Sequence, residues 1–299
     1  MAKDIIGFIG LGVMGRPMAE NLRSAGYPLV VHNRSQGAVE ALVSAGAERA
    51  GSPAEVAARA NVVITMLPDT PDVEAVYLGP QGVLAAIREG SALLDMSTAS
   101  PSLARRLAAL AAEKGASWLD APVSGGEVGA RAGTLSIMVG GDEAALERAR
   151  PLLEVMGSTI LHIGGPGTGQ VAKAANQIAV GLALAAVGEA LTLAKKGGAD
   201  PARVRGALLA GFAQSRVLDL HGERALKGQY DPGFRLRLHR KDLGIALALA
   251  RESDVPLAHT ALLHETMNAM IAAGDGDRDH AAVIRWVARL AGMEGLDKE

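Results

Sequence analysis

The chain has 299 residues, enough for about two domains with sizeable hydrophobic cores. Apolar residues make up 49% and charged residues 21%, which excludes a wholly disordered chain. With 30 basic and 32 acidic residues the formal net charge is −2, so we expect neither nucleic acid nor a membrane surface as a partner. The chain has no cysteine, which excludes disulfides, thiolate metal sites and cysteine nucleophiles, and suits a cytoplasmic protein.

The first half of the chain alternates short apolar runs with helical patterns. Its first apolar run leads directly into a glycine cluster, so it is typical of a buried strand rather than a signal peptide. The predicted strands are 5–9, 29–31, 62–66, 92–95, 118–120 and 135–139. The predicted helices are near 14–25, 36–45, 72–77 and 101–114. This alternation predicts an α/β domain, a Rossmann-type doubly wound parallel sheet with helices on both faces.

The second half changes character and is helix-like almost throughout. We predict helices near 168–197, 201–210, 215–227, 240–253, 258–273 and 279–291. Gly164–Gly167 (GGPG) is unsuited to a helix or strand interior, so we place the boundary there. The prediction is an NAD(P)-binding Rossmann domain over residues 1–164 and an all-α domain over 165–299. We expect the active site in the cleft between them.

The run 178–194 is strongly apolar but contains Glu189 and is followed by Lys195 and Lys196. A membrane span needs about 20 apolar residues and rarely holds an acid, so this run predicts a buried helix. Because it is apolar on more than one face, we expect another domain or subunit to cover it, in a homodimer or homotetramer.

A G-x-G-x-x-G motif stands between the first strand and the first helix. It runs through Gly10, Leu11, Gly12, Val13, Met14 and Gly15. The first glycine permits the tight turn, the second lets the backbone approach a pyrophosphate, and the third lets the helix pack closely. The free N–H groups of the helix N-terminus attract phosphate. The motif therefore predicts a dinucleotide cofactor, although a glycine-rich turn without a ligand is the alternative.

The end of the second strand bears on which nicotinamide cofactor is used. An acid about 20 residues after the motif would hold the ribose 2′-OH of NAD. Here the residues are Asn33, Arg34 and Ser35, without an acid. Arg34 can pair with a 2′-phosphate, which favours NADP(H), with NAD(H) still possible. The alternative is an ordinary surface arginine in a turn.

Two further loops follow predicted strands and are expected to line the cofactor. They contain Met66, Leu67 and Pro68, and Ser97 and Thr98. Ligands of open α/β sheets bind beyond the carboxyl ends of parallel strands. No His-Glu-x-x-His or other paired metal-ligand spacing occurs, so we expect no metal.

Four blocks in the same order resemble the β-hydroxyacid dehydrogenase family. They are Gly7–Leu22 (GFIGLGVMGRPMAENL), Asp120–Gly126 (DAPVSGG), Gly164–Gln177 (GGPGTGQVAKAANQ) and Lys241–Leu243 within HRKDLGIAL. The resemblance covers nearly the whole chain and implies a nicotinamide-dependent oxidoreductase. Its substrate would be a small hydroxy acid or semialdehyde acid.

The third block implies the catalytic residues. Lys173 lies on an otherwise uncharged helical run, where desolvation favours a neutral, proton-transferring lysine. A lysine that reaches the helix surface is the alternative. Asn176 and Gln177 lie one turn further on the same face. They can bond the substrate oxygen and hold the lysine. The family often has an amide at both positions, frequently asparagine; here the second is glutamine, so which amide touches the substrate stays open.

The second and fourth blocks imply further substrate contacts. Ser124, Gly125 and Gly126 offer a hydroxyl and backbone N–H groups to a carboxylate, although a plain turn has the same pattern. Lys241, expected at the start of a helix, would lie near the nicotinamide and substrate; the sequence alone favours a solvated lysine at a helix end.

The stretch Ser215–Leu243 is most similar to family members that reduce tartronate semialdehyde to D-glycerate. The resemblance therefore implies that reaction. The alternatives are 3-hydroxyisobutyrate oxidation, reduction of succinic semialdehyde or glyoxylate, and a non-catalytic NADP-binding module. Lys173 is present, which argues against the non-catalytic alternative.

Overall fold

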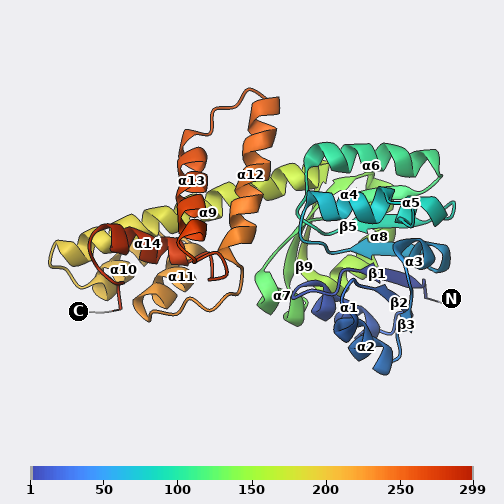
Figure 1. The fold of residues 1–299 in the computed structure, drawn as a ribbon, viewed down its shortest axis with the longest axis horizontal. Helices are drawn as coiled ribbons and strands as arrows, with labels where there is room; N and C mark the ends of the chain where they lie inside the picture. The colour runs from blue at the N-terminus through green and yellow to red at the C-terminus, as the bar shows by residue number, and fades with distance from the viewer. Residues whose placement is uncertain (1–2, 298–299) are drawn as a thin grey trace. The chain divides into compact units, whose positions relative to one another are not determined.

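The computed structural model describes residues 3–297 and forms two compact units, with the division between Lys173 and Ala174. The division falls inside the long helix α9 (Thr168–Lys196), whose first residues belong to the first unit. The first unit carries the sheet and the second is helical, which confirms the predicted fold class (Figure 1).

A nine-stranded sheet forms the centre of the first unit. Its order is β3-β2-β1-β4-β5-β6-β8-β7, and β9 pairs with β8. The strands are β1 (Ile6–Ile9), β2 (Leu29–His32), β3 (Glu48–Arg49), β4 (Val62–Thr65), β5 (Ala92–Asp95), β6 (Ser117–Asp120), β7 (Val123–Ser124), β8 (Leu135–Gly141) and β9 (Gly157–Gly164). Strand order reverses at β1 and β4, the place where open α/β sheets bind ligands.

The strands β1 to β6 run parallel, as predicted, but β8 runs antiparallel to both β6 and β7. The prediction of a parallel sheet is therefore wrong at this edge. The connection Gly125–Thr134 is too short for a parallel crossover, which requires about a dozen residues or more. The alternation of apolar residues in a strand does not reveal its direction, so the sequence pattern missed this.

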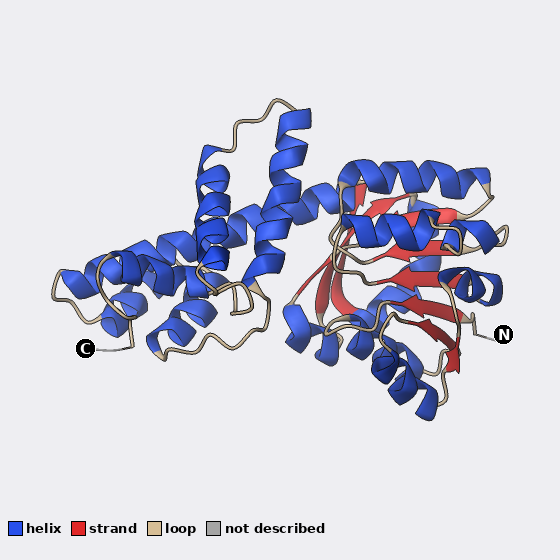
Figure 2. Ribbon diagram, in the orientation of Figure 1, coloured by secondary structure: helices blue, strands red, loops and turns tan. Residues whose placement is uncertain are grey.

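Helices cover both faces of the sheet (Figure 2). One face holds α1 (Gly15–Ser24), α2 (Gln36–Ser44), α7 (Gly126–Ala132) and α8 (Glu143–Met156). The other holds α3 (Pro53–Arg59), α4 (Thr70–Leu78), α5 (Val83–Ala86) and α6 (Pro101–Glu113). Neighbouring strand residues alternate between the two cores: Phe8 and Ile64 pack on the first, Ile9 and Val63 on the second.

Four of these helices were not predicted. The helices α3, α5 and α7 have only four to seven residues, too few to show a helical period. The helix α8 has 14 residues but contains Pro151, which reads as a helix breaker in a sequence. The strands β3 and β7 are too short, and β9 too exposed, to show the apolar pattern of a buried strand, so they were not predicted either.

The six predicted helices of the second half are all present. They are α9, α10 (Pro201–Leu209), α11 (Arg216–Leu226), α12 (Leu236–Glu252), α13 (Ala258–Ala272) and α14 (Ala282–Leu290). Their core includes Leu184, Leu243 and Met267. The helix α12 begins at Leu236, so Lys241 lies in its second turn and not at its start, which corrects the sequence-based placement.

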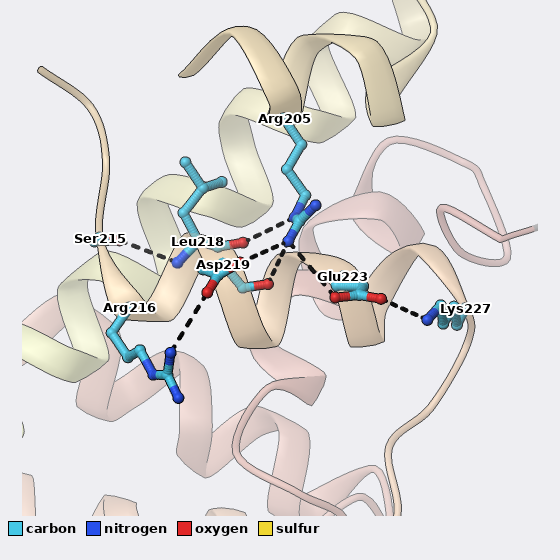
Figure 3. A network of polar contacts seen from close by, with 7 residues as sticks. All are labelled: Arg205, Ser215, Arg216, Leu218, Asp219, Glu223 and Lys227. Atoms are coloured by element: carbon cyan, nitrogen blue, oxygen red, sulfur yellow. Dashed lines mark hydrogen bonds and ion pairs between the residues drawn. The ribbon is translucent and has the colours of Figure 1, made fainter. Parts of the chain in front are cut away.

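The corner between α10 and α11 is fixed by Arg205 (Figure 3). Its guanidinium donates to the carbonyl oxygens of Leu218 (3.2 Å) and Asp219 (2.6 Å), and pairs with the Asp219 carboxylate at 3.0 Å. The hydroxyl of Ser215 accepts from the Leu218 N–H at 3.0 Å and caps α11. These contacts hold the first part of Ser215–Leu243 in place.

Among the described residues, α9 is the one helix long and apolar enough to span a membrane, with mean hydropathy 1.7 over 18 residues. It also carries the buried polar side chains Gln170, Lys173, Gln177 and Thr192. Buried polar groups are costly in lipid without partners and are ordinary in a helix packed within a protein. Length and composition therefore give weak evidence for a membrane span.

Candidate active site

The glycine loop between β1 and α1 has the geometry that the motif predicts. Gly10 has φ 96°, and a Cβ there would lie 2.3 Å from the carbonyl oxygen of Met66. A Cβ on Gly15 would lie 1.9 Å from the carbonyl oxygen of Gly10. A Cβ on Gly12 would meet nothing within 4 Å, so the space beside it is open. Two glycines thus serve the tight turn and the helix packing, and the third faces open space.

The N-terminus of α1 has unused hydrogen-bond donors. Met14 occupies the N-cap position without a side-chain cap, and the first turn contains no acid. Within residues 3–297 the backbone amides of Gly12, Val13 and Met14 have no hydrogen-bond partner. The amide of Leu11, in contrast, donates to Oδ1 of Asn33 at 3.0 Å. The loop therefore fits the pyrophosphate of a dinucleotide through three amides, without that of Leu11.

The loop after β2 holds the residues expected to select the cofactor. The Asn33 side chain is fully engaged within the protein, because it also donates to the carbonyl and hydroxyl oxygens of Ser35 at 2.9 and 2.8 Å. Asn33 thus fixes the glycine loop and the turn together. Arg34 is exposed and takes part in no ion pair among the described residues. Its guanidinium is available for an anionic ligand.

The loops after β4 and β5 are joined by Ser97. Its hydroxyl accepts from the Leu67 N–H at 2.8 Å, and its side chain is fully buried. Ser97 therefore holds the neighbouring loop. Met66, Leu67 and Thr98 are half-buried and Pro68 is exposed, so these four retain surface for a ligand.

A buried carboxyl lies directly below these loops. Asp95 accepts from the Thr65 hydroxyl at 2.8 Å and from the Ser97 N–H at 3.2 Å, and Thr65 also bonds Tyr77 at 3.1 Å. Burial raises the pKa of Asp95 to about 6, which the bonds from Ser97 and Thr65 partly offset. The same burial raises the pKa of Tyr77. This group secures the ends of β4 and β5.

The first turn of α9 is attached to the end of β6. The Asp120 carboxylate accepts from the backbone N–H groups of Gly167 (2.7 Å) and Gln170 (3.0 Å). Burial raises the pKa of Asp120, and these backbone bonds partly oppose that shift. Lys173 lies one turn further along α9 and is 7% exposed. Lys173 is therefore a buried residue, and the surface alternative is wrong.

The predicted anion cradle follows β7. Gly125 and Gly126 have φ 139° and 62°, conformations that favour glycine. Ser124 is half-buried, Gly125 is exposed, and a Cβ on Gly126 would meet nothing within 4 Å. The turn is therefore open to a small anion.

In the second unit, four polar side chains form a continuous chain of contacts. Asn176 Nδ2 donates to Gln177 Oε1 at 2.8 Å, and Gln177 Nε2 donates to Asp242 Oδ2 at 2.6 Å. The other oxygen of Asp242 pairs with Nζ of Lys241 at 3.0 Å; the Asp242 side chain is buried, at 3% exposure, and that of Lys241 is half-buried, at 14%. Lys241 is thus an ion-paired, half-buried lysine and not a solvated lysine at a helix end.

Histidines lie behind this chain. His239 Nε2 bonds the backbone carbonyl of Gln177 at 2.9 Å, and its Nδ1 bonds Nδ1 of His280 at 2.8 Å. His221, Asp279 and His280 bring potential metal-ligand atoms within 4.8 Å of one another. The Asp279 carboxylate, however, already accepts from three backbone N–H groups and faces Arg224 at 3.3 Å. We therefore interpret this cluster as a structural one that stabilises the chain around α12 and α14.

Sequence reasoning missed the supporting role of four residues: Asp120, Gln170, Asp242 and His239. For Asp120, the one sequence feature that could have indicated this role was its position at the end of a predicted strand. The contacts of Gln170 and Asp242 join residues 50 to 73 positions apart, so no local pattern reveals them.

Comparison with known proteins decides the family. A family model described as the NAD binding domain of 6-phosphogluconate dehydrogenase matches residues 5–164. A second, described as the NAD-binding domain of NADP-dependent 3-hydroxyisobutyrate dehydrogenase, matches residues 167–287. The chain belongs to the β-hydroxyacid dehydrogenase family. It is thus an NAD(P)-dependent oxidoreductase that acts on a CH–OH group.

Three relatives within the β-hydroxyacid dehydrogenases bear on the reaction. The 2-hydroxy-3-oxopropionate reductase of Escherichia coli is 48% identical, covering 96% of this chain and 98% of that protein. The NAD-dependent L-serine dehydrogenase of Pseudomonas aeruginosa is 42% identical over 93% and 96%. A structure of Mycobacterium tuberculosis 3-hydroxyisobutyrate dehydrogenase with L-serine has TM-score 0.88 and 36% identity, covering 94% and 98%.

Proposed function

We propose that this protein reduces tartronate semialdehyde (2-hydroxy-3-oxopropionate) to D-glycerate with NADPH. The observation that carries the substrate is the 48% identity with a 2-hydroxy-3-oxopropionate reductase along nearly the full length of both chains. The similarity to an L-serine dehydrogenase and to a 3-hydroxyisobutyrate dehydrogenase makes oxidation of a small 3-hydroxy acid the second candidate. NADH remains an alternative cofactor, because one of these relatives is NAD-dependent.

The glycine loop would hold the cofactor, and Lys173 would transfer the proton. When bound, the nicotinamide supplies the hydride that the carbonyl carbon accepts. Lys173 Nζ donates a proton to the carbonyl oxygen during reduction and accepts it during oxidation. Its burial supports this role, since a desolvated lysine loses its proton more readily than an exposed one.

Ser124, Gly125 and Gly126 would bind the substrate carboxylate with the hydroxyl and backbone N–H groups. Asn176 is the better candidate of the two amides for the substrate oxygen. The Gln177 side chain is engaged at both of its polar atoms, whereas Asn176 keeps its carbonyl oxygen and one N–H. Gln177 would position Asn176, and Lys241 would stay paired with Asp242 beside the substrate.

Arg34 supports the preference for NADPH. The ribose-contacting position has no acid, Asn33 is committed to the glycine loop, and the adjacent Arg34 is exposed. A guanidinium recognises a 2′-phosphate through charge-assisted bonds. The sequence contains no paired metal-ligand motif, and the proposed reaction uses no metal ion.

Steady-state oxidation of NADPH and NADH tests this function. The substrates are tartronate, methylmalonate and succinate semialdehydes, each with and without EDTA, and L-serine and 3-hydroxyisobutyrate serve in the oxidative direction. EDTA-insensitive turnover with a clear preference for tartronate semialdehyde and NADPH supports the proposal. Preference for 3-hydroxyisobutyrate or L-serine would show that this compound, and not tartronate semialdehyde, is the substrate. Tight NADPH binding without turnover would favour a non-catalytic binding module.

We further propose a cytoplasmic protein that is a homodimer or homotetramer. The most apolar 18-residue window of α9 is only 39% buried, which supports a covering subunit. Sedimentation equilibrium measures the oligomeric state directly, and a monomer at micromolar concentration would contradict it.

A further inference from the structure

We propose that Gln170 is a positioning residue that holds the loop Ser97–Ala99 and the first turn of α9 in one fixed arrangement. The inference rests on the proposed function, in which this loop lines the cofactor and α9 carries Lys173. All of the residues that support it lie in the first unit.

The Gln170 side chain is 1% exposed and uses both of its polar atoms on the loop after β5. Its Nε2 donates to the carbonyl oxygen of Ser97 at 2.8 Å, and its Oε1 accepts from the N–H of Ala99 at 3.0 Å. These two bonds bracket Thr98, one of the residues expected to touch the cofactor. The amide therefore fixes the backbone on both sides of Thr98.

The backbone of Gln170 is fixed as firmly as its side chain. Its N–H donates to Asp120, which also accepts from Gly167. A Cβ on Gly169 would lie 2.4 Å from the Asp120 carbonyl oxygen and 2.5 Å from that of Met138, so the helix start packs directly on the sheet. One residue thus joins β5, β6 and α9.

Lys173 lies three residues after Gln170, on the same face of α9. A shift of the loop relative to the helix would therefore change the placement of the Lys173 ammonium group relative to Thr98. Misplacement of reacting groups by about 1 Å lowers rates about 100-fold. This gives Gln170 an effect on kcat without contact with the substrate.

Only a side chain that donates and accepts at once satisfies this site. A glutamate can accept from Ala99 but places a carboxylate oxygen against the Ser97 carbonyl oxygen. Once protonated, it can donate to Ser97 again. The charged or titratable groups around it are Asp95, Asp120, Lys173 and, beside Gly167, Arg105. All four are present in wild type, so comparison with wild type at each pH isolates residue 170.

The test compares Gln170→Leu and Gln170→Glu with wild type and with Gln81→Leu, an exposed glutamine of the same unit. We measure kcat per NADPH-binding site between pH 5.5 and 8. We expect Gln170→Leu to lower kcat about 10- to 100-fold at every pH, with NADPH Kd changed less than about threefold. Gln170→Glu should match it at pH 8 and recover about tenfold as the pH falls, because burial raises the pKa of a carboxyl.

Hydrogen exchange of segments 97–99 and 168–173 provides a readout that does not depend on activity. We expect Gln170→Leu to accelerate exchange in both segments and Gln81→Leu in neither. A Gln170→Leu kcat within about twofold of wild type, or faster exchange in one segment alone, overturns the inference, even if the variant melts earlier. Wild-type protein without turnover on any substrate refutes the proposed function instead, and the exchange result then decides the coupling by itself.

Discussion

The two units support their polar residues in different ways. In the first unit the buried carboxylates Asp95 and Asp120 accept from backbone N–H groups and hydroxyls, and neither has an ion-pair partner among residues 3–297. In the second unit Asp242 and Asp279 are paired with cations, Lys241 at 3.0 Å and Arg224 at 3.3 Å. The first unit therefore stabilises its buried carboxylates with hydrogen bonds alone, whereas the second unit adds a cation to each.

This difference matches what each unit is proposed to do. Backbone amides suit a cofactor whose phosphates are recognised by the N–H groups of a loop, so the first unit needs exact loop positions. A small substrate is recognised by a few side chains, so the second unit needs those side chains held at both ends. A carboxylate without a cation is also easier to protonate, which gives the first unit a pH dependence of its own.

The largest effect is expected at Lys173, which tests whether the first unit also carries the proton-transferring group. Lys173→Met keeps the aliphatic stem and should lower kcat about 100- to 10,000-fold, the usual contribution of a general acid. NADPH affinity, measured by fluorescence titration, should stay near wild type. The exposed Lys114→Met is the control. An active Lys173→Met enzyme would exclude Lys173 as the acid.

Asp95→Asn tests the pH dependence of the first unit. Burial raises the pKa of Asp95 from its ordinary 3.8 to about 6, so the folded protein holds this proton more tightly than the unfolded chain. Wild type therefore loses up to about 3 kcal/mol of stability from this group as the pH rises from about 4 to 6.

The difference in unfolding free energy, variant minus wild type, should rise over that range and level off above about pH 7. Urea unfolding at several pH values measures it, with the exposed Asp4→Asn as the control. A difference that does not change with pH would show that the Asp95 carboxyl titrates normally and would remove this contrast between the units.

Asp242→Asn tests the charged arrangement of the second unit. The change keeps an acceptor for Gln177 and removes the negative charge beside Lys241, leaving a half-buried ammonium group without its carboxylate. We expect kcat/KM for the semialdehyde to fall about 10- to 50-fold. Removing one partner of such an ion pair costs several kcal/mol, and movement of the remaining ammonium group recovers part of that cost.

The NADPH Kd of Asp242→Asn should stay unchanged, because the glycine loop belongs to the other unit. The control is Asp277→Asn, an exposed carboxylate of the second unit that also pairs with cations. If weaker NADPH binding accounts for the loss, the proposal that the Lys241–Asp242 pair lies beside the substrate is wrong.

The smallest effect is expected at Arg34 and sharpens the role of the first unit. Arg34→Ala should raise KM for NADPH about tenfold and leave KM for NADH within about twofold, because a charge-assisted bond contributes about 1.5 to 3 kcal/mol, less when exposed. Arg106→Ala, on the surface of α6, is the control. Equal losses with both cofactors would exclude recognition of the 2′-phosphate by Arg34.

The sequence by itself determined many of the elements and the cofactor loop. Apolar periodicity gave six strands and all six helices of the second half, because burial of one face repeats at a fixed spacing. The glycine motif fixed the loop, since its three glycines answer local demands of the turn. Lys173 stood out because a charge in a long apolar run is visible without the fold.

Only the tertiary structure decided how those residues are held. The antiparallel edge of β8, the partial burial of Lys241, and the bonds of Gln170 to Ser97 and Ala99 leave no trace in local spacing. Gln177 and Asp242, 65 positions apart, meet because two helices pack together. Hydrogen bonds between distant side chains depend on how whole elements pack together, whereas apolar periodicity and turn geometry depend on residues that are close in the sequence.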